Sequence, residues 1–211
     1  MWLDDDESDI LFDSVRKSGS KKMVQRIHKL LDQCDACVTY NGSSFDLPTL
    51  NKEFVQSGMT PPSPYKSIDL YQTAKKVFRF PSNKLEYISQ TLKIGGKVKH
   101  EGHELWVKVM ANDPDAWKRM EEYNKGDVIL LKRLYQKMLP WIPSHPNVAL
   151  IDGAGLSCPA CNSTNVHRRG YAYTTCNRYV RLRCNECGTW SREAQAQSGL
   201  EERQKLYRRV A

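Results

Sequence analysis

Hydrophobic residues recur with two different periods over the first part of the chain. Apolar residues at every third or fourth position predict helices over residues 20–33 and 47–57. Compact apolar runs predict short strands over residues 10–15 and 36–40, and a turn-forming Asn-Gly pair ends the second of them. Strands that alternate with helices in this way are typical of an α/β fold.

Two further helices are predicted before Pro140. Residues 67–70 fit either a short strand or the start of a helix, and spaced apolar residues predict a helix over residues 85–92. Asp113 followed by Pro114 is an N-cap with proline at the first helical position, and a helical apolar pattern then continues to Pro140.

The pattern changes after this helix, where prolines and glycines become frequent. We expect an extended linker over residues 143–155, because such residues do not continue a helix. Short strands and turns are predicted beyond it. The sequence therefore divides into a full domain over residues 1–142, a small module over residues 156–192 and a polar tail over residues 193–211.

Charge indicates the class of partner. The 211 residues include 32 Lys and Arg against 24 Asp and Glu, a formal net charge of +8, although residues 1–15 are acidic. A basic body favours a polyanion such as nucleic acid. No apolar run approaches the roughly 20 residues needed to cross a membrane, and the acidic start is unlike a signal peptide. We therefore expect a cytoplasmic protein with no membrane partner.

Two short motifs carry candidate catalytic groups. Asp46 lies just after a predicted strand, at the start of a helix, and Tyr123 precedes Asp127 by four residues on one helix face. Carboxylates bind Mg²⁺ or Mn²⁺, and a phenol can orient an attacking water, so these groups suit metal-dependent phosphodiester hydrolysis. Taken singly, each motif is also explained by a helix cap or by chance.

Five segments together carry a family resemblance: NGSSFDLPTL, SIDL, SNKLEYISQTL, KVKHEGHELW and YNKGDV. They resemble the DEDDy 3′-5′ exonucleases, ribonuclease H-like enzymes often encoded by bacteriophages, which would place the protein in the host cytoplasm. The resemblance implies a ribonuclease H-like mixed sheet with flanking helices. It implies metal ligation by Asp46 and Asp127 and water positioning by Tyr123. Four more side chains are implied near the nucleic acid, with solvated loop positions as the alternative for the last three: Asn41, Lys84, His100 and His103.

The first motif of that family, an Asp-x-Glu pair on a buried strand, is not found in this sequence. Asp5-Asp6-Glu7 has the right letters but lies in a polar, turn-like stretch. We therefore expect the domain to be incomplete at its start, which would leave the strand over residues 36–40 with an open edge. Three explanations stay open: a truncated reading of a longer gene, completion by a partner or second copy, and a nuclease relic that binds without cutting.

Two CxxC pairs near the C-terminus predict a zinc ribbon with four ligands, Cys158, Cys161, Cys184 and Cys187. Four thiolates leave no open coordination position, so the Zn²⁺ would be structural, and free thiols are the alternative. Cys176 is interpreted as a non-ligand in a hairpin tip. Cys34 and Cys37 have the same spacing but lie at a helix end and in a strand, so we expect core cysteines.

Basic and aromatic residues are interleaved between the two cysteine pairs. They form a candidate surface of six residues, Arg168, Arg169, Tyr171, Tyr179, Arg181 and Arg183. Such side chains hold phosphates and stack on bases, which favours single-stranded ends, and a solvated basic hairpin is the alternative. The sequence thus predicts a metal-dependent 3′-5′ exonuclease-like protein with weak or no activity. The alternative is a catalytically silent module, derived from such a nuclease, that binds nucleic acid or a protein.

Overall fold

The computed structural model describes residues 10–96, 102–151, 155–197 and 199. It divides the chain into two compact units, Met1–Met138 and Leu139–Ala211. The Asp5-Asp6-Glu7 stretch and His100 lie outside the described residues.

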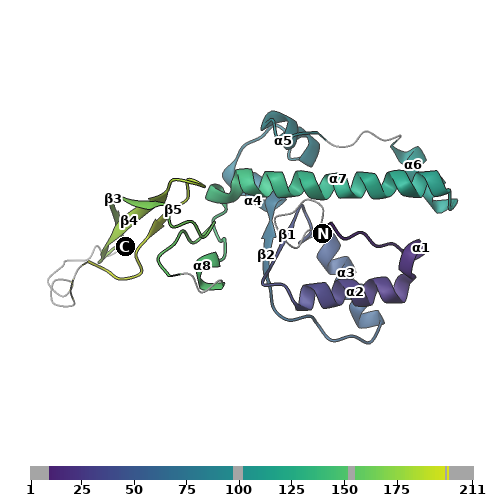
Figure 1. The fold of residues 1–211 in the computed structure, drawn as a ribbon, viewed down its shortest axis with the longest axis horizontal. Coiled ribbons are helices and arrows are strands. Elements are labelled where there is room, and N and C mark those ends of the chain that lie inside the picture. The colour runs from purple at the N-terminus through teal and green to yellow at the C-terminus, as the bar shows by residue number, and fades with distance from the viewer. Residues whose placement is uncertain (1–9, 97–101, 152–154, 198, 200–211) are drawn as a thin grey trace. The chain divides into compact units, whose positions relative to one another are not determined.

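The first unit consists of short helices, one long helix and a parallel pair of strands. In chain order its elements are α1 (Val15–Ser18), α2 (Ser20–Asp32), β1 (Ala36–Thr39), α3 (Asp46–Gln56), β2 (Lys66–Asp69), α4 (Leu70–Val77), α5 (Leu85–Thr91), α6 (His103–Met110) and α7 (Pro114–Met138). Val38 of β1 lies opposite Ile68 of β2, and no other strand of the described residues joins this sheet. Figure 1 shows the strand pair between α7 and the helices α2 and α3.

The long helix α7 begins and ends where the sequence predicts. Asp113 Oδ1 accepts hydrogen bonds from the backbone N–H groups of Asp115 and Ala116, at 2.8 and 2.9 Å. These bonds satisfy two amides that have no partner within the helix. The helix ends at Met138, two residues before a proline.

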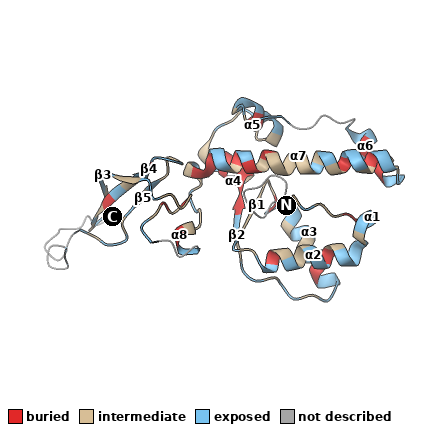
Figure 2. Ribbon diagram, viewed as in Figure 1, coloured by how far each residue is buried: buried red, intermediate tan, exposed pale blue. Residues whose placement is uncertain are grey.

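Two apolar clusters of described residues join helices of the first unit. Val24 and Leu31 of α2 pack with Phe54 of α3, and the half-buried Cys34 and Cys37 lie against them. The second cluster joins α6 to the start of α7 through four buried residues: Leu105, Val109, Ala116 and Met120. Figure 2 shows buried residues along α4, α7 and β2. Cys34 and Cys37 thus serve as core cysteines, as predicted.

The strand predicted over residues 10–15 is wrong. Residues 10–14 have no regular structure, and Val15 starts the helix α1. Ser14 Oγ accepts from Lys17 N at 3.2 Å, and Asp13 Oδ1 accepts from Ser14 N at 2.8 Å. Such local side-chain bonds to the backbone compete with strand formation, so the polar pair outweighs the apolar run.

Hydrophobic periodicity did not decide the secondary structure of two other segments. Residues 67–70 contain both alternatives, because β2 ends at Asp69 and α4 begins at Leu70. The helix α6 was not predicted. Three of its apolar side chains are exposed and obscure its periodic face: Trp106, Val107 and Met110.

The second unit contains η1 (Leu139–Trp141), α8 (Val148–Ile151) and the antiparallel strands β3 (Val166–Tyr173), β4 (Arg178–Cys184) and β5 (Trp190–Arg192). The expected extended linker includes the short helix α8. Asn147 Oδ1 accepts from Ala149 N at 3.2 Å, and Val148 N donates to Pro159 O at 2.9 Å, so this segment is folded against the first cysteine turn.

No helix in the described ranges has both the length and the apolar character to span a membrane; α7, with 25 residues, carries charges along its whole length.

The buried face of α7 predicts a large effect of truncating Leu134, whose side chain is 0% exposed. We expect Leu134→Ala to lower the free energy of unfolding by about 2–5 kcal/mol, since it removes buried methyl groups and leaves a cavity. Urea denaturation followed by far-UV circular dichroism measures this loss. Val55→Ala is the control, because Val55 is 71% exposed on α3 and should change stability by less than about 0.5 kcal/mol. Equal losses in the two variants would contradict the assigned core.

Candidate functional site

The loop between β1 and α3 has a backbone that few sequences can adopt. Asn41 has a φ of 62°, in the left-handed region. A Cβ atom on Gly42 would lie 2.5 Å from Thr39 Cβ, so only glycine fits there. Gly42 O then accepts from Leu47 N at 2.8 Å, which joins the loop to the first turn of α3. Asp46, the first residue of that helix, is thereby set directly after the loop.

Asp69 at the end of β2 holds this loop in place. Its Oδ1 accepts from Asn41 N at 2.8 Å, and its Oδ2 accepts from Ser43 N at 3.2 Å and from Ser43 Oγ. Oδ1 also accepts from Tyr71 N at 3.0 Å, so the same carboxylate caps α4. The side chain is 9% exposed. Sequence reasoning did not identify Asp69 as part of the site, although an acid between a strand and a helix is a capping signal.

Asp46 lies in a partly desolvated environment even though the residue is exposed overall. Burial raises the pKa of its carboxyl group, and the negative charge of Asp69 raises it further. Burial also raises the pKa of the Cys37 thiol to about 11, with smaller contributions from Cys34 and Asp46. Asp46 thus lies near enough to Asp69 and Cys37 to interact electrostatically with both, close to the loop that follows β1.

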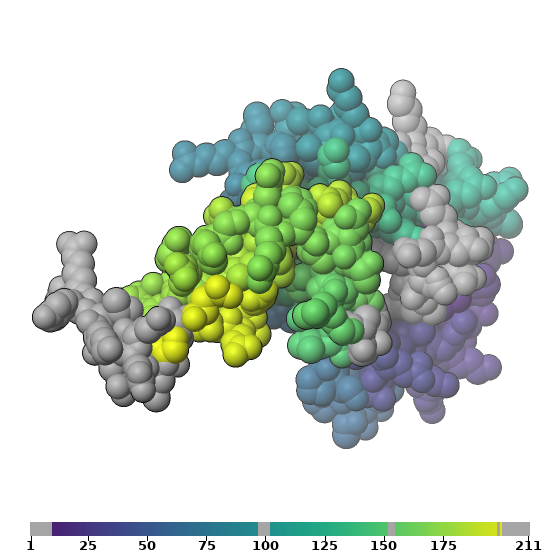
Figure 3. Space-filling view, turned by 60° about the vertical axis from the view of Figure 1, so that its left-hand side comes forward, coloured from purple at the N-terminus to yellow at the C-terminus, as the bar shows by residue number. Residues whose placement is uncertain are grey.

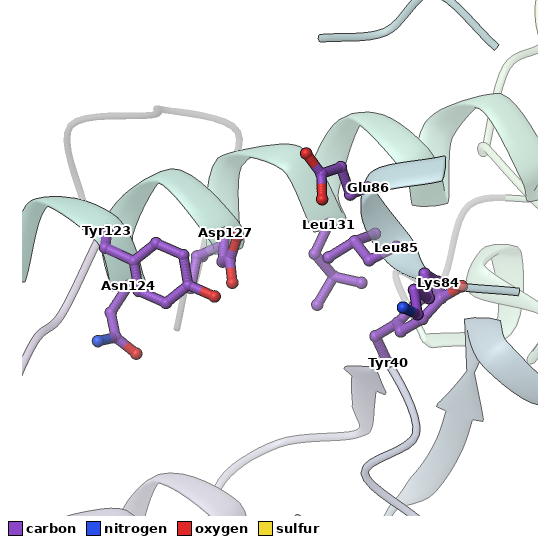
Figure 4. Close-up of a pocket in the computed structure, with 9 residues that line it drawn as sticks. Tyr40, Lys84, Leu85, Glu86, Tyr123, Asn124, Asp127 and Leu131 are labelled. Atoms are coloured by element: carbon purple, nitrogen blue, oxygen red, sulfur yellow. The ribbon is translucent and has the colours of Figure 1, made fainter. Parts of the chain in front are cut away.

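An open groove of about 630 Å³ lies between the end of β1, the start of α5 and the middle of α7 (Figure 4). Nine residues line it: Tyr40, Lys84, Leu85, Glu86, Tyr123, Asn124, Asp127, Val128 and Leu131. Tyr123 and Asp127 project from the same side of α7, whereas Lys84 and Tyr40 lie farther along, beyond Leu131 (Figure 4). The Oδ1 atom of Asp127 is buried.

Tyr40 ties the end of β1 to the loop before α5. Its hydroxyl donates to Asn83 O at 2.6 Å. Burial raises the pKa of Tyr40 to about 12, and neighbouring Tyr71 and Asp69 add to the shift, so the phenol stays protonated as a donor. This bond places Lys84, the residue after Asn83, at the groove.

The structure brings three of the predicted residues of the first unit into one groove, namely Lys84, Tyr123 and Asp127. Asn41 and Asp46 belong to the neighbouring loop and do not line the groove. His103 is exposed at the start of α6 and is also outside it. Tyr40 and Glu86 line the groove but were not predicted.

No three acidic side chains of the described residues lie close enough to one another to share a metal ion. In the described part of the chain, the four cysteines of the second unit are the only group of three or more metal-binding side chains close enough to hold an ion. Two-metal phosphoryl chemistry needs carboxylates around both ions. The groove offers the Lys84 ammonium and tyrosine hydroxyl groups to a phosphate, and among the described residues no third acid completes a metal-binding group with Asp46 and Asp127.

Replacing Asp69 tests the electrostatic contact with Asp46. We expect Asp69→Asn to lower the pKa of Asp46 because it removes a nearby negative charge. The pKa should remain above its ordinary value, since burial is the larger cause. Titration of the Asp46 carboxyl carbon by NMR measures this shift.

Asp32→Asn is the matched control for this titration. Asp32 also holds a loop, accepting from Ser63 N at 2.8 Å and from Ser63 Oγ at 2.9 Å, but it does not contribute to the Asp46 shift. An Asp46 pKa that is unchanged in Asp69→Asn, or lowered equally by both substitutions, would contradict the contact.

The four predicted zinc ligands of the second unit converge. The Sγ atoms of Cys158, Cys161, Cys184 and Cys187 all lie within 4.8 Å of one another. Cys158 and Cys187 are 3.6 Å apart, and Cys161 and Cys184 are 3.7 Å apart. These separations are too long for disulfides but match tetrahedral zinc, whose bonds of about 2.3 Å place the sulfurs about 3.8 Å apart. The cluster can therefore hold Zn²⁺.

Two equivalent tight turns form this cluster. Asn162 follows the first CxxC pair with a φ of 59°, and Gly188 follows the second with a φ of 80°. Cys158 N donates to Ser163 O at 2.8 Å, and Cys184 N donates to Thr189 O at 3.0 Å, so each pair begins with the same hydrogen bond to the residue five positions later. The Thr189 hydroxyl lies 3.2 Å from Cys187 Sγ, where it can donate to a thiolate. Cys176 is outside the cluster.

Metal analysis of the purified chain tests this site. We expect one zinc per chain, lost in Cys158→Ser together with the NMR signals of β3–β5, because the ligands connect the turns that carry these strands. Cys176→Ser, which removes a thiol outside the cluster, should keep its zinc and its spectrum. Equal zinc loss from both variants would contradict the four-cysteine assignment.

The six predicted nucleic-acid residues of the second unit do not share one face. In the β3–β4 register, Arg168 lies opposite Leu182 and Tyr171 opposite Val180, so both lie on the side of β4 that carries its buried residues. Tyr179, Arg181 and Arg183 lie on the other side of β4. Arg169 lies in the irregularity between Arg168 and Tyr171.

Comparison with known families gives a match for the first unit. A family model described as the RNase H superfamily matches residues 2–139, more than half of the 211-residue chain. Curated proteins give no match to the sequence.

Proposed function

The chain belongs to the RNase H superfamily, and from this membership we propose that it is an exonuclease-like protein of the DEDDy type that binds the 3′ ends of nucleic acid. RNase H-like nucleases act on nucleic acid with divalent metals, which supports this ligand class. The observation that carries the proposal is the groove that gathers Tyr123, Asp127 and Lys84.

The proposal assigns a role to each of these groups. The Lys84 ammonium binds a phosphate, as a flexible point charge with three donors. Tyr123 and Asp127, one helical turn apart on α7, face the reacting end, where the phenol positions water. Asp46 is the second acid, and Asn41 maintains the loop that carries it, because its backbone N–H donates a hydrogen bond to Asp69 Oδ1.

Hydrolysis by this chain is proposed to be weak or absent. Asp46 and Asp127 are not joined by a third acid in the described residues, and two carboxylates hold a pair of hydrated ions poorly. The same observation favours the alternative, a catalytically silent module derived from such a nuclease. A protein-binding form of this alternative is supported by β1, which pairs only with β2 among the described strands. Such an edge can accept a strand from a second copy or another protein.

An end-labelled single-stranded DNA, incubated with the full chain and Mn²⁺, tests the activity. We expect shortening no faster than in matched samples of Asp46→Ala and Asp127→Ala, while the DNA still binds. Robust Mn²⁺-dependent trimming that both substitutions abolish would contradict weak hydrolysis and establish an active exonuclease.

The binding role of the groove has its own control. Lys84→Ala should weaken binding of a recessed 3′ end, whereas Lys29→Ala, which removes an exposed lysine of α2, should not. Equal affinities in the two variants would contradict the groove as the binding site.

A further inference from the structure

One face of the three-stranded sheet in the second unit is formed by arginines and aromatic rings. The register places Arg181 opposite Arg192 and Arg183 opposite Trp190, so these four side chains share a face. Tyr179 joins them because it precedes Arg181 by two positions on β4. We call these five residues the arginine face. Trp190 and Arg192 were missed by the sequence analysis, although Trp-Ser-Arg after the second cysteine pair is a short alternating strand signal.

Aromatic rings, not carboxylates, hold the arginines of this face. The Arg192 guanidinium lies 3.7 Å from the centre of the Tyr179 ring. Those of Arg181 and Arg183 lie 5.0 and 5.6 Å from the centre of the Trp190 ring. Within the described residues, none of these three arginines has an acidic partner. Their three positive charges are therefore not neutralised on the sheet.

The other face differs in this respect. There Arg168 forms an ion pair with Glu193, at 3.4 Å between Nη2 and Oε1. Arg178 lies over the Tyr171 ring at 4.7 Å. Val180 and Cys184 are buried on the same side. An anion that approaches this face meets the Glu193 carboxylate and the side of the sheet that carries the buried residues.

A bulge in β3 fixes one arginine of the arginine face. Gly170, with a φ of 76°, lies in the shifted register between Arg168 and Tyr171. A Cβ there would lie 3.5 Å from Arg181 Nη2, and Arg181 Nε donates to Arg169 O at 2.9 Å. The Arg169 carbonyl of the bulge thus accepts a hydrogen bond from one N–H group of the Arg181 guanidinium. The other N–H groups of that guanidinium are left for a ligand. Part of the side-chain entropy that binding would cost is already lost.

We propose that the arginine face binds single-stranded nucleic acid, with phosphates at the guanidinium groups of Arg181, Arg183 and Arg192 and bases stacked on Trp190 and Tyr179. A guanidinium stacked on a ring presents the N–H groups at its edge to a phosphate. Arg181 Nε and Arg192 Nη1 already donate to the backbone carbonyls of Arg169 and Glu193, at 2.9 and 3.3 Å, and the remaining N–H groups are left for the ligand. Trp190 is 51% exposed, which leaves ring surface for a base. Strands β3–β5 lie in the green to yellow part of the surface in Figure 3. This inference takes its ligand class, nucleic acid, from the proposed function. It does not depend on the groove of the first unit.

Arg181 and Arg183 suit neighbouring phosphates because of their spacing. Two positions along a strand separate them by about 6.6 Å, at roughly 3.3 Å per residue. This separation is comparable to that of successive phosphates in an extended single strand. A duplex presents its bases stacked on one another, so the two rings would have no base to receive. The arginine face should therefore prefer single strands to duplexes.

Salt-dependent binding of the full chain to a labelled oligothymidine, followed by fluorescence anisotropy, tests the inference. The double variant Arg181→Ala/Arg183→Ala should lower the affinity and reduce the slope of log affinity against log salt by about 1.4, or about 0.7 for each lost phosphate contact. Trp190→Ala should weaken binding roughly fivefold to hundredfold through the lost stacking. Zinc content, measured on every variant, shows whether the second unit is still folded.

The matched control is Arg168→Ala/Arg178→Ala, which removes the same charge from the opposite face and should leave the slope unchanged. Equal slopes in the two double variants would show that only net charge matters and would overturn the inference. An oligothymidine affinity unchanged in Arg181→Ala/Arg183→Ala would also overturn it. These substitutions leave α5 and α7 intact, so their outcome is separate from that of the trimming assay and of Lys84→Ala.

Discussion

The carboxylate of Asp69 is the constraint on which the candidate site of the first unit depends. Asp69 is the last residue of β2, and its carboxylate caps α4. The carboxylate also accepts hydrogen bonds from the backbone N–H groups of Asn41 and Ser43 in the loop after β1. Because β1 and β2 are parallel, their carboxyl ends meet at one edge, where open α/β sheets commonly place ligands. The bonds require the loop to pass close to β1, which in turn requires glycine at position 42. The position of Asp46 is therefore fixed by a buried acid on another strand, and the negative charge of that acid also raises the Asp46 pKa.

Local signals predicted the parts of the fold that depend on nearby residues. The N-cap at Asp113 and the two CxxC turns each complete their hydrogen bonds within a few positions, so spacing alone locates them. The prediction of a strand over residues 10–15 is wrong for the same physical reason. Asp13 and Ser14 make local hydrogen bonds to the backbone, and a count of apolar residues does not detect such bonds. Local chemistry decided all of these segments, but only in some did it agree with the hydrophobic pattern.

Contacts between distant residues could not be predicted in this way. Nothing around Asp69 indicates that it accepts bonds from a loop 28 positions earlier. The alternation along β4 does predict that Tyr179, Arg181 and Arg183 share a face. The bulge at Gly170 then shifts the register of β3 and sets Arg168 and Tyr171 on the other side. Without this irregularity, regular alternation would place Arg168 and Tyr171, three positions apart, on opposite sides of the sheet.

The two proposed binding surfaces differ in how much they can contribute to affinity. The groove offers one lysine to a phosphate, whereas the arginine face offers three guanidinium groups and two rings. Phosphate contacts add to affinity one by one, so the arginine face should supply most of the salt-dependent binding. The groove, with its single lysine, is left with a smaller share of the affinity, although the proposal places the water-positioning phenol there.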